Sequence, residues 1–276
     1  MRCCYRETYY KCGDYLEANI YPVYKQGTGR RKKSKPTPEG KQKLNELASQ
    51  NKIIRLANAN FTSNDLKVEL TYSQDHHPVD DEAAARELRN FLRRVKRFRD
   101  RNGMSELKYI AVTEKGKKLG RYHHHLIMND MPLKDLVQLW GNGIVGTDIL
   151  QFDENGVASL ASYMMKQARE VSGKKKYTRS QNLIDPQPVS RDAASKRKIL
   201  ELAADVECRA EYEKLHEGYF LAAASVVFND TNGGVYIHAR YYRKEAEFCS
   251  RKKKRMNRQS YLPGQSTSKG STPNLN

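Results

Sequence analysis

Two histidines and a glutamate carry the most informative spacing for chemistry in this sequence. Glu114 closes a run of alternating apolar and polar residues, and His123 and His125 open the next apolar run, with a turn of glycine and lysine between. Side chains alternate between the two faces of a strand, so His123 and His125 share a face while His124 points the other way. A hairpin would bring Glu114 alongside the two histidines. Imidazole and carboxylate ligands suit a divalent ion such as Mn, Mg or Zn.

Tyr163 and Lys166 predict a second kind of chemistry. They lie three residues apart in a segment expected to be helical, 157–170, and are therefore neighbours on one helix face. A phenol is a poor nucleophile at neutral pH because its pKa is about 10. A divalent ion makes a phosphate more electrophilic, and a lysine beside the phenol favours the phenolate or holds the phosphate. The pair therefore predicts a tyrosine that becomes covalently linked to one DNA end.

Each of these features also has an interpretation without chemistry. Consecutive histidines can be polar residues on a hairpin edge, and Tyr163 can be an ordinary helix residue among 17 tyrosines. Tyr177 is a second candidate nucleophile, but it follows a lysine run in a predicted loop. His76 and His77 precede a proline, and we expect a solvated loop there. The order of glutamate, histidine pair and tyrosine favours the metal-dependent site.

Composition indicates an anionic partner. The 276-residue chain has 50 Lys and Arg against 32 Asp and Glu, a formal net charge of +18. This charge favours binding to a polyanion, although solubility alone is an alternative explanation. Five cysteines, with Cys3 next to Cys4, match neither a disulfide framework nor a zinc knuckle, so we expect reduced thiols. The sequence has no apolar segment of membrane-spanning length and no secretory signal, which predicts a cytoplasmic protein.

The elements that must position the site alternate between strands and helices. Alternating apolar residues predict strands over 66–72, 107–113, 124–128 and 147–152. An apolar stripe predicts a helix from Asp80 or Asp81 to Phe98, and Pro132 begins a short helix ending near Trp140. We expect further helices near 40–50, 157–170 and 192–215, and a hairpin from 225–228 and 235–239.

Changes in composition divide the chain into four parts. We predict a tyrosine-rich and basic N-terminal extension (1–55), a catalytic domain (56–190), a helical and hairpin accessory region (191–250) and a basic disordered tail (251–276). The tyrosines of residues 1–24 favour packing over stacking on bases. Gly141–Gly146 matches G-x-G-x-x-G, but it follows a helix and precedes a strand, the reverse of a nucleotide-binding loop. We therefore expect no nucleotide cofactor.

Three stretches recur in one order: Val68-Glu-Leu-Thr-Tyr72, Gly120-Arg-Tyr-His-His-His125 and Tyr163-Met-Met-Lys166. They resemble the three motifs of the HUH endonucleases, specifically the rolling-circle replication initiators (Rep proteins) of phages and plasmids. In that family the first motif is a core strand whose threonine supports the site, the second binds metal and the third carries the catalytic tyrosine. Glu114 lies where related initiators often have a third ligand. The middle residue of the second motif is usually apolar, whereas here it is His124.

The resemblance implies an α+β fold in which helices pack on a central, about five-stranded antiparallel sheet, with basic extensions at both ends. It implies a metal-dependent endonuclease that nicks single-stranded origin DNA, forms a 5′-phosphotyrosine intermediate and rejoins strands in rolling-circle replication. Mn or Mg is the expected cofactor. Expected partners are origin DNA and a helicase and polymerase from the host or a separate protein, in the bacterial cytoplasm and without a membrane. The expected DNA-binding residues are Lys117, Lys118, Arg121, Lys174, Lys175, Lys176 and Arg179.

Two alternatives remain at this point. A relaxase for conjugation or a single-strand transposase would use the same chemistry for another task. A non-catalytic basic nucleic-acid-binding protein, for example one that binds RNA, would use the histidines as an ordinary polar strand and Tyr163 only for packing.

Overall fold

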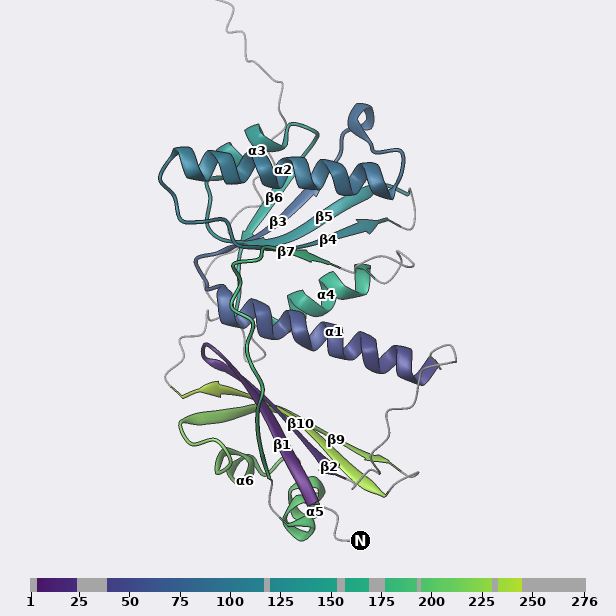
Figure 1. The fold of residues 1–276 in the computed structure, drawn as a ribbon, viewed down its shortest axis with the longest axis vertical. Coiled ribbons are helices and arrows are strands. Elements are labelled where there is room, and N and C mark those ends of the chain that lie inside the picture. The colour runs from purple at the N-terminus through teal and green to yellow at the C-terminus, as the bar shows by residue number, and fades with distance from the viewer. Residues whose placement is uncertain are drawn as a thin grey trace, which may run out of the picture.

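The protein is an α+β structure with two antiparallel sheets of five strands, against which the helices pack (Figure 1). This computed structural model describes residues 4–23, 39–116, 120–152, 157–168, 177–192, 195–229 and 233–244. The α+β fold predicted from the sequence is confirmed. The strands are β1 (Cys4–Cys12), β2 (Tyr15–Val23), β3 (Leu66–Thr71), β4 (Tyr109–Lys115), β5 (Tyr122–Met128), β6 (Val145–Ile149), β7 (Thr178–Arg179), β8 (Val189–Asp192), β9 (Tyr219–Asn229) and β10 (Gly234–Arg243). The helices are α1 (Glu39–Asn60), the 3-10 turn η1 (Gln74–His76), α2 (Asp81–Arg101), α3 (Leu133–Trp140), α4 (Ala158–Ala168), α5 (Lys196–Ala204) and α6 (Arg209–Glu213).

The sheet that contains the three histidines, here the histidine sheet, has the strand order β6-β3-β5-β4-β7. Its four longer strands coincide with the four predicted from alternation, with shifts of about two residues at β4 and β6. The central strand β5 pairs antiparallel with β3 on one side and β4 on the other. Residues of β5 are therefore held between two neighbours, which fixes the face to which each histidine points.

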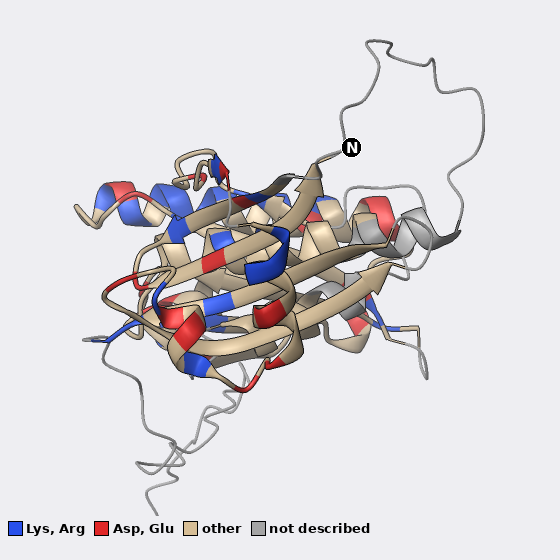
Figure 2. Ribbon diagram, turned by 90° about the horizontal axis from the view of Figure 1, so that it is seen from below, with Lys and Arg blue, Asp and Glu red and all other residues tan. Residues whose placement is uncertain are grey.

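Helices α2 and α3 cover one face of the histidine sheet (Figure 1). The Asp80 side chain accepts a hydrogen bond from the Ala83 backbone N at 2.7 Å and caps α2, one of the two predicted positions. The predicted apolar stripe of α2 is buried against β3, β5 and Trp140 of α3. The other side of α2 is rich in exposed arginine and lysine. Figure 2 shows such residues, with acidic ones among them, on several helices and strands.

The second sheet is built from both ends of the chain and has the order β8-β1-β2-β10-β9; we call it the terminal sheet. The sequence predicts an extension and a separate accessory region for these residues, whereas their strands pair with one another: β2 lies directly beside β10. The β9–β10 hairpin is confirmed. The predicted helix over 192–215 is two shorter helices, α5 and α6, preceded by β8. The domain boundaries themselves stay a prediction.

Helices α1 and α4 form a layer between the two sheets (Figure 1). Apolar residues of α1, α4 and both sheets meet in one core cluster, which includes Ile53, Ala161, Ile127 and Tyr15. Arg55 of α1 also pairs with the buried Glu17 of β2 at 2.8 Å. Burial raises the pKa of Glu17, but hydrogen bonding and charge from His238 and Arg55 outweigh burial and lower the pKa overall. The middle layer therefore connects the two sheets by apolar and ionic contacts.

The glycine string 141–146 has a structural role. Gly141 ends α3 in the left-handed conformation, with φ at 66°, and an added Cβ on Gly143 would lie 2.3 Å from the Thr71 carbonyl oxygen. Glycine is therefore required for a turn at one position and for close backbone approach at the other.

Several predicted segments lie outside the described residues. These are the basic linker 26–38, the lysine run 174–176, and the tail 251–276. None of the helices in the described ranges is long and apolar enough to cross a membrane.

Candidate active site

The β4–β5 hairpin brings Glu114 and the histidines onto neighbouring strands, as the sequence predicts. Glu114 lies directly opposite His123 in the register, and His125 lies opposite Val112. Glu114, His123 and His125 all project from the face that looks toward α1 and α4, the face to which Ile110, Val112 and Ile127 also contribute.

Glu114 and His125 are in direct contact. Their Oε2 and Nε2 atoms lie 3.0 Å apart, and the His125 side chain is 2% exposed while that of Glu114 is 16% exposed. The other ring nitrogen of His125 and the Nδ1 of His123 are buried and have no hydrogen-bond partner within the described residues. A buried polar atom without a partner is costly and calls for an explanation such as an unseen ion or water.

The donor set suits a divalent ion, but the three side chains do not all meet at one point. In the ranges that the structure describes, no group of three or more His, Cys, Asp or Glu side chains is gathered closely enough to hold a metal. The pair of Glu114 and His125 is formed, and His123 lies beside it by register. A carboxylate and an imidazole with an unpaired second imidazole beside them fit metal chemistry in type, and the metal itself stays a proposal.

His124 is a structural residue on the opposite face. It is fully buried, with Nε2 2.7 Å from the Tyr72 hydroxyl and Nδ1 2.9 Å from Thr113 Oγ1. Burial, together with the neighbouring His125 and His123, lowers the pKa of His124 to about 3. A neutral imidazole held by two hydroxyl groups beside Trp140 belongs to the core under α2 and α3.

Tyr163 lies next to the Glu114–His125 pair. Its ring meets the ring of His125 edge-on, with centroids 5.5 Å apart and planes at 81°. Helix α4 is held in place by the buried Ala161 and Met164 and by a hydrogen bond of 2.6 Å between Ser162 and Gln50 of α1. Tyr163 itself is 44% exposed. A phenol that is accessible and adjacent to the polar pair can reach a bound substrate.

The partner lysine and the second candidate tyrosine have different surroundings. Lys166 follows Tyr163 within α4, but its side chain is outside the described part of the structure. Tyr177 is half-buried against the core between the sheets, and burial raises its pKa. Ionisation of Tyr177 is therefore disfavoured by its surroundings.

The predicted DNA-binding residues are only partly described. Arg121 is exposed at the start of β5, and the Arg179 guanidinium pairs with Asp185 at 3.2 Å. Lys117, Lys118, Lys174, Lys175 and Lys176 lie outside the described residues.

Glu69 is a site residue that the sequence analysis missed. It lies directly opposite His125 on β3, and Thr71 lies opposite His123. Leu66, Val68 and Leu70 are buried under α2, so Glu69 and Thr71 face the same side as the two histidines. The alternation within the first motif could have indicated this face, because the register follows once β3 is paired with β5.

Comparison with known families adds a second line of support. Residues 65–168 match the model of a family described as replication-associated protein ORF2. The match runs from β3 to the end of α4 and so includes Glu69, Glu114, His123, His125 and Tyr163. No curated protein and no solved structure matches the chain. The match associates this protein with DNA replication and is consistent with a replication initiator.

Proposed function

We propose that this protein is a replication-initiation endonuclease that nicks single-stranded origin DNA through Tyr163 and later rejoins the strands. The observation that carries the proposal is the meeting of three elements at His125: Glu114 lies 3.0 Å from its Nε2, and the Tyr163 ring lies edge-on to its imidazole. All three residues fall within the segment that matches the replication-associated model.

In this proposal Tyr163 is the nucleophile. Its oxygen forms a bond to the phosphorus of a DNA phosphodiester, the bond from phosphorus to the 3′ oxygen breaks, and that oxygen leaves as a hydroxyl with the proton lost by the phenol. The 5′ phosphate stays on the tyrosine. Because the linkage conserves the phosphodiester bond energy, a 3′ hydroxyl can attack it and rejoin the strands. Lys166, one helical turn further on, would hold the phosphate.

Glu114, His123 and His125 would hold a divalent ion, Mn or Mg. When bound, such an ion neutralises charge on the phosphoryl oxygens and so favours attack by a phenol. The unpartnered Nδ1 atoms of His123 and His125 support a ligand at this place. Strand separation and synthesis would come from a helicase and polymerase of the host or of a separate protein.

A covalent-adduct assay tests this function. The protein is incubated with labelled single strands that tile the DNA flanking its gene, together with Mn or Mg, and the products are separated on a denaturing gel. We expect a labelled protein band that disappears with chelator and in Tyr163→Phe. Tyr177→Phe is the matched control and should retain the band. An adduct that persists in Tyr163→Phe would contradict the proposal.

A further inference from the structure

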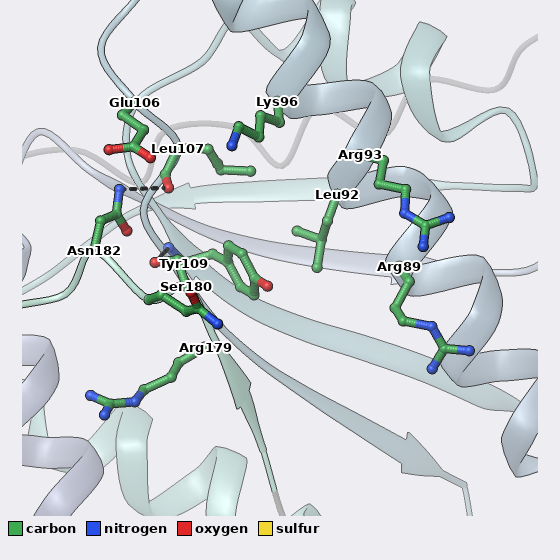
Figure 3. A pocket seen from close by; sticks show the side chains of 11 residues that line it. Arg89, Leu92, Arg93, Lys96, Glu106, Leu107, Tyr109, Arg179, Ser180 and Asn182 are labelled. Carbon is green, nitrogen blue, oxygen red and sulfur yellow. Dashed lines mark hydrogen bonds between the residues drawn. The ribbon is translucent and has the colours of Figure 1, made fainter.

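A second anionic site is indicated on the other face of the histidine sheet. A cavity of about 650 Å³ lies between α2 and the β4–β7 edge of this sheet (Figure 3). Its lining includes Arg89, Arg93 and Lys96 from α2, and Tyr109 from β4. Tyr109 alternates with Ile110, which faces α1 and α4, so this groove is separated from the Glu114–His125 pair by the sheet itself.

The α2 wall of the groove is cationic. Arg89, Arg93 and Lys96 follow at intervals of four and three residues and therefore lie on one helix face. All three are exposed, and no carboxylate among the described residues forms an ion pair with them. Glu106 supplies a single carboxylate to the lining. The guanidinium of Arg179 turns to Asp185, so its charge is already engaged.

The opposite wall is aromatic and polar. The Tyr109 ring projects into the space between α2 and Ser180, with Leu92 and Leu107 beside it (Figure 3). Asn182 donates from Nδ2 to the Leu107 carbonyl at 3.2 Å, while its Oδ1 is buried without a hydrogen-bond partner within the described ranges. Three cations therefore face an aromatic ring and an unused acceptor across a cavity of ligand size.

We propose that this groove binds an unpaired nucleotide of the DNA strand outside the nick site. Arg89, Arg93 and Lys96 would contact its phosphate and the next one, the base would lie against Tyr109, and Asn182 Oδ1 would accept a hydrogen bond from a base amino group. The strand would pass from one face of the sheet to the other around the short edge strand β7. This inference rests on the proposed function for the identity of the polyanion.

The single-stranded form is favoured by the shape and chemistry of the groove. A base can enter a cavity and stack on an aromatic ring only when it is unpaired, whereas a duplex would present its phosphates to the outer surface of α2. Arg86 and Arg97 lie on the same helix, are exposed and do not line the groove. They offer a control with the same change of charge.

Binding of a fluorescein-labelled mixed-sequence single strand, followed by anisotropy over a range of salt, tests the proposal. All variants are made in Tyr163→Phe protein, so that covalent capture does not contribute. We expect Arg89→Ala/Arg93→Ala to weaken binding by about tenfold or more and to reduce the salt slope by about 1.4, since each phosphate contact on a single strand contributes about 0.7. Arg86→Ala/Arg97→Ala should weaken binding by no more than about threefold.

The aromatic wall has its own test. Tyr109→Leu should weaken single-strand binding, and Tyr109→Phe should retain it because the ring is conserved. Equal losses in the groove pair and the control pair, or equal losses for single-stranded and duplex DNA of the same sequence, would overturn the proposal. Failure of wild-type protein to form any adduct, with groove variants still deficient in binding, would reject the nicking function alone. Adduct formation together with full binding by the groove variants would reject the groove alone.

Discussion

The three consecutive histidines have two different roles because strand geometry separates them. His123 and His125 face Tyr163 and the middle helices, whereas His124 is enclosed between Tyr72, Thr113 and Trp140. Alternation along a strand was enough to predict this division. It was not enough to identify Glu69, because Glu69 becomes a neighbour of His125 only through the register between β3 and β5.

Replacing each histidine by alanine should separate structure from chemistry. His124→Ala removes a buried ring and leaves two hydroxyl groups without a partner, so the free energy of unfolding should fall by about 2–4 kcal/mol. His123 is partly exposed, so His123→Ala should cost less than about 1 kcal/mol while abolishing adduct formation. Urea unfolding and the adduct gel measure the two effects. Equal losses of stability would show that the faces are assigned wrongly.

At the scale of elements, local sequence patterns predicted most of the histidine sheet. Period-two alternation indicated β3 to β6, and a capped apolar stripe indicated α2. The position of β7 was missed, since a strand of two residues has no detectable period. The glycine string was correctly denied a nucleotide role, but its contact with Thr71 depends on how α3 returns to the sheet and could not be predicted from local sequence.

Two glycines of this string make a matched pair. A Cβ at Gly143 would lie 2.3 Å from the Thr71 carbonyl oxygen, whereas a Cβ at Gly146 would lie 3.9 Å from the Glu69 Cβ, an ordinary contact. Gly143→Ala should therefore reduce the free energy of unfolding by about 2–4 kcal/mol, and Gly146→Ala by less than about 1 kcal/mol. Chemical denaturation gives both values. The account of the α3–β6 connection fails if the order is reversed.

For the whole molecule, the terminal sheet was the part that the sequence did not predict. Its strands come from opposite ends of the chain, so no local period links them, and its tyrosines suggested an extension. Glu7 on β1 contacts His216 Nε2 at 2.8 Å and also pairs with Arg191, which joins the N-terminus to segments that follow β7. Pairing of this kind is determined by long-range packing, not by nearby residues.

Glu7 should make the stability of this sheet depend on pH. Burial raises the pKa of Glu7, but hydrogen bonds and charge from His216 and Arg191 outweigh it and hold the pKa below its ordinary value of 4.5. The folded protein then binds fewer protons than the unfolded chain. The contribution is present above pH 4.5 and is lost as the pH falls through the folded pKa.

Glu7→Gln should reduce the free energy of unfolding by about 1–3 kcal/mol at neutral pH, and the gap to wild type should shrink in acid. Thermal unfolding of both proteins across this pH range measures the gap. A gap that stays constant would mean that the ionised carboxylate of Glu7 does not stabilise the fold.

The central claim is that a phenol next to the Glu114–His125 pair takes up the DNA phosphate. Mass spectrometry of the nuclease-trimmed, protease-digested adduct locates the modified residue directly. We predict a nucleotide phosphate on the peptide that contains Tyr163, attached to its side-chain oxygen. A phosphate on Tyr177 or another residue would contradict this account, as would an adduct that never forms with divalent metal and origin DNA present.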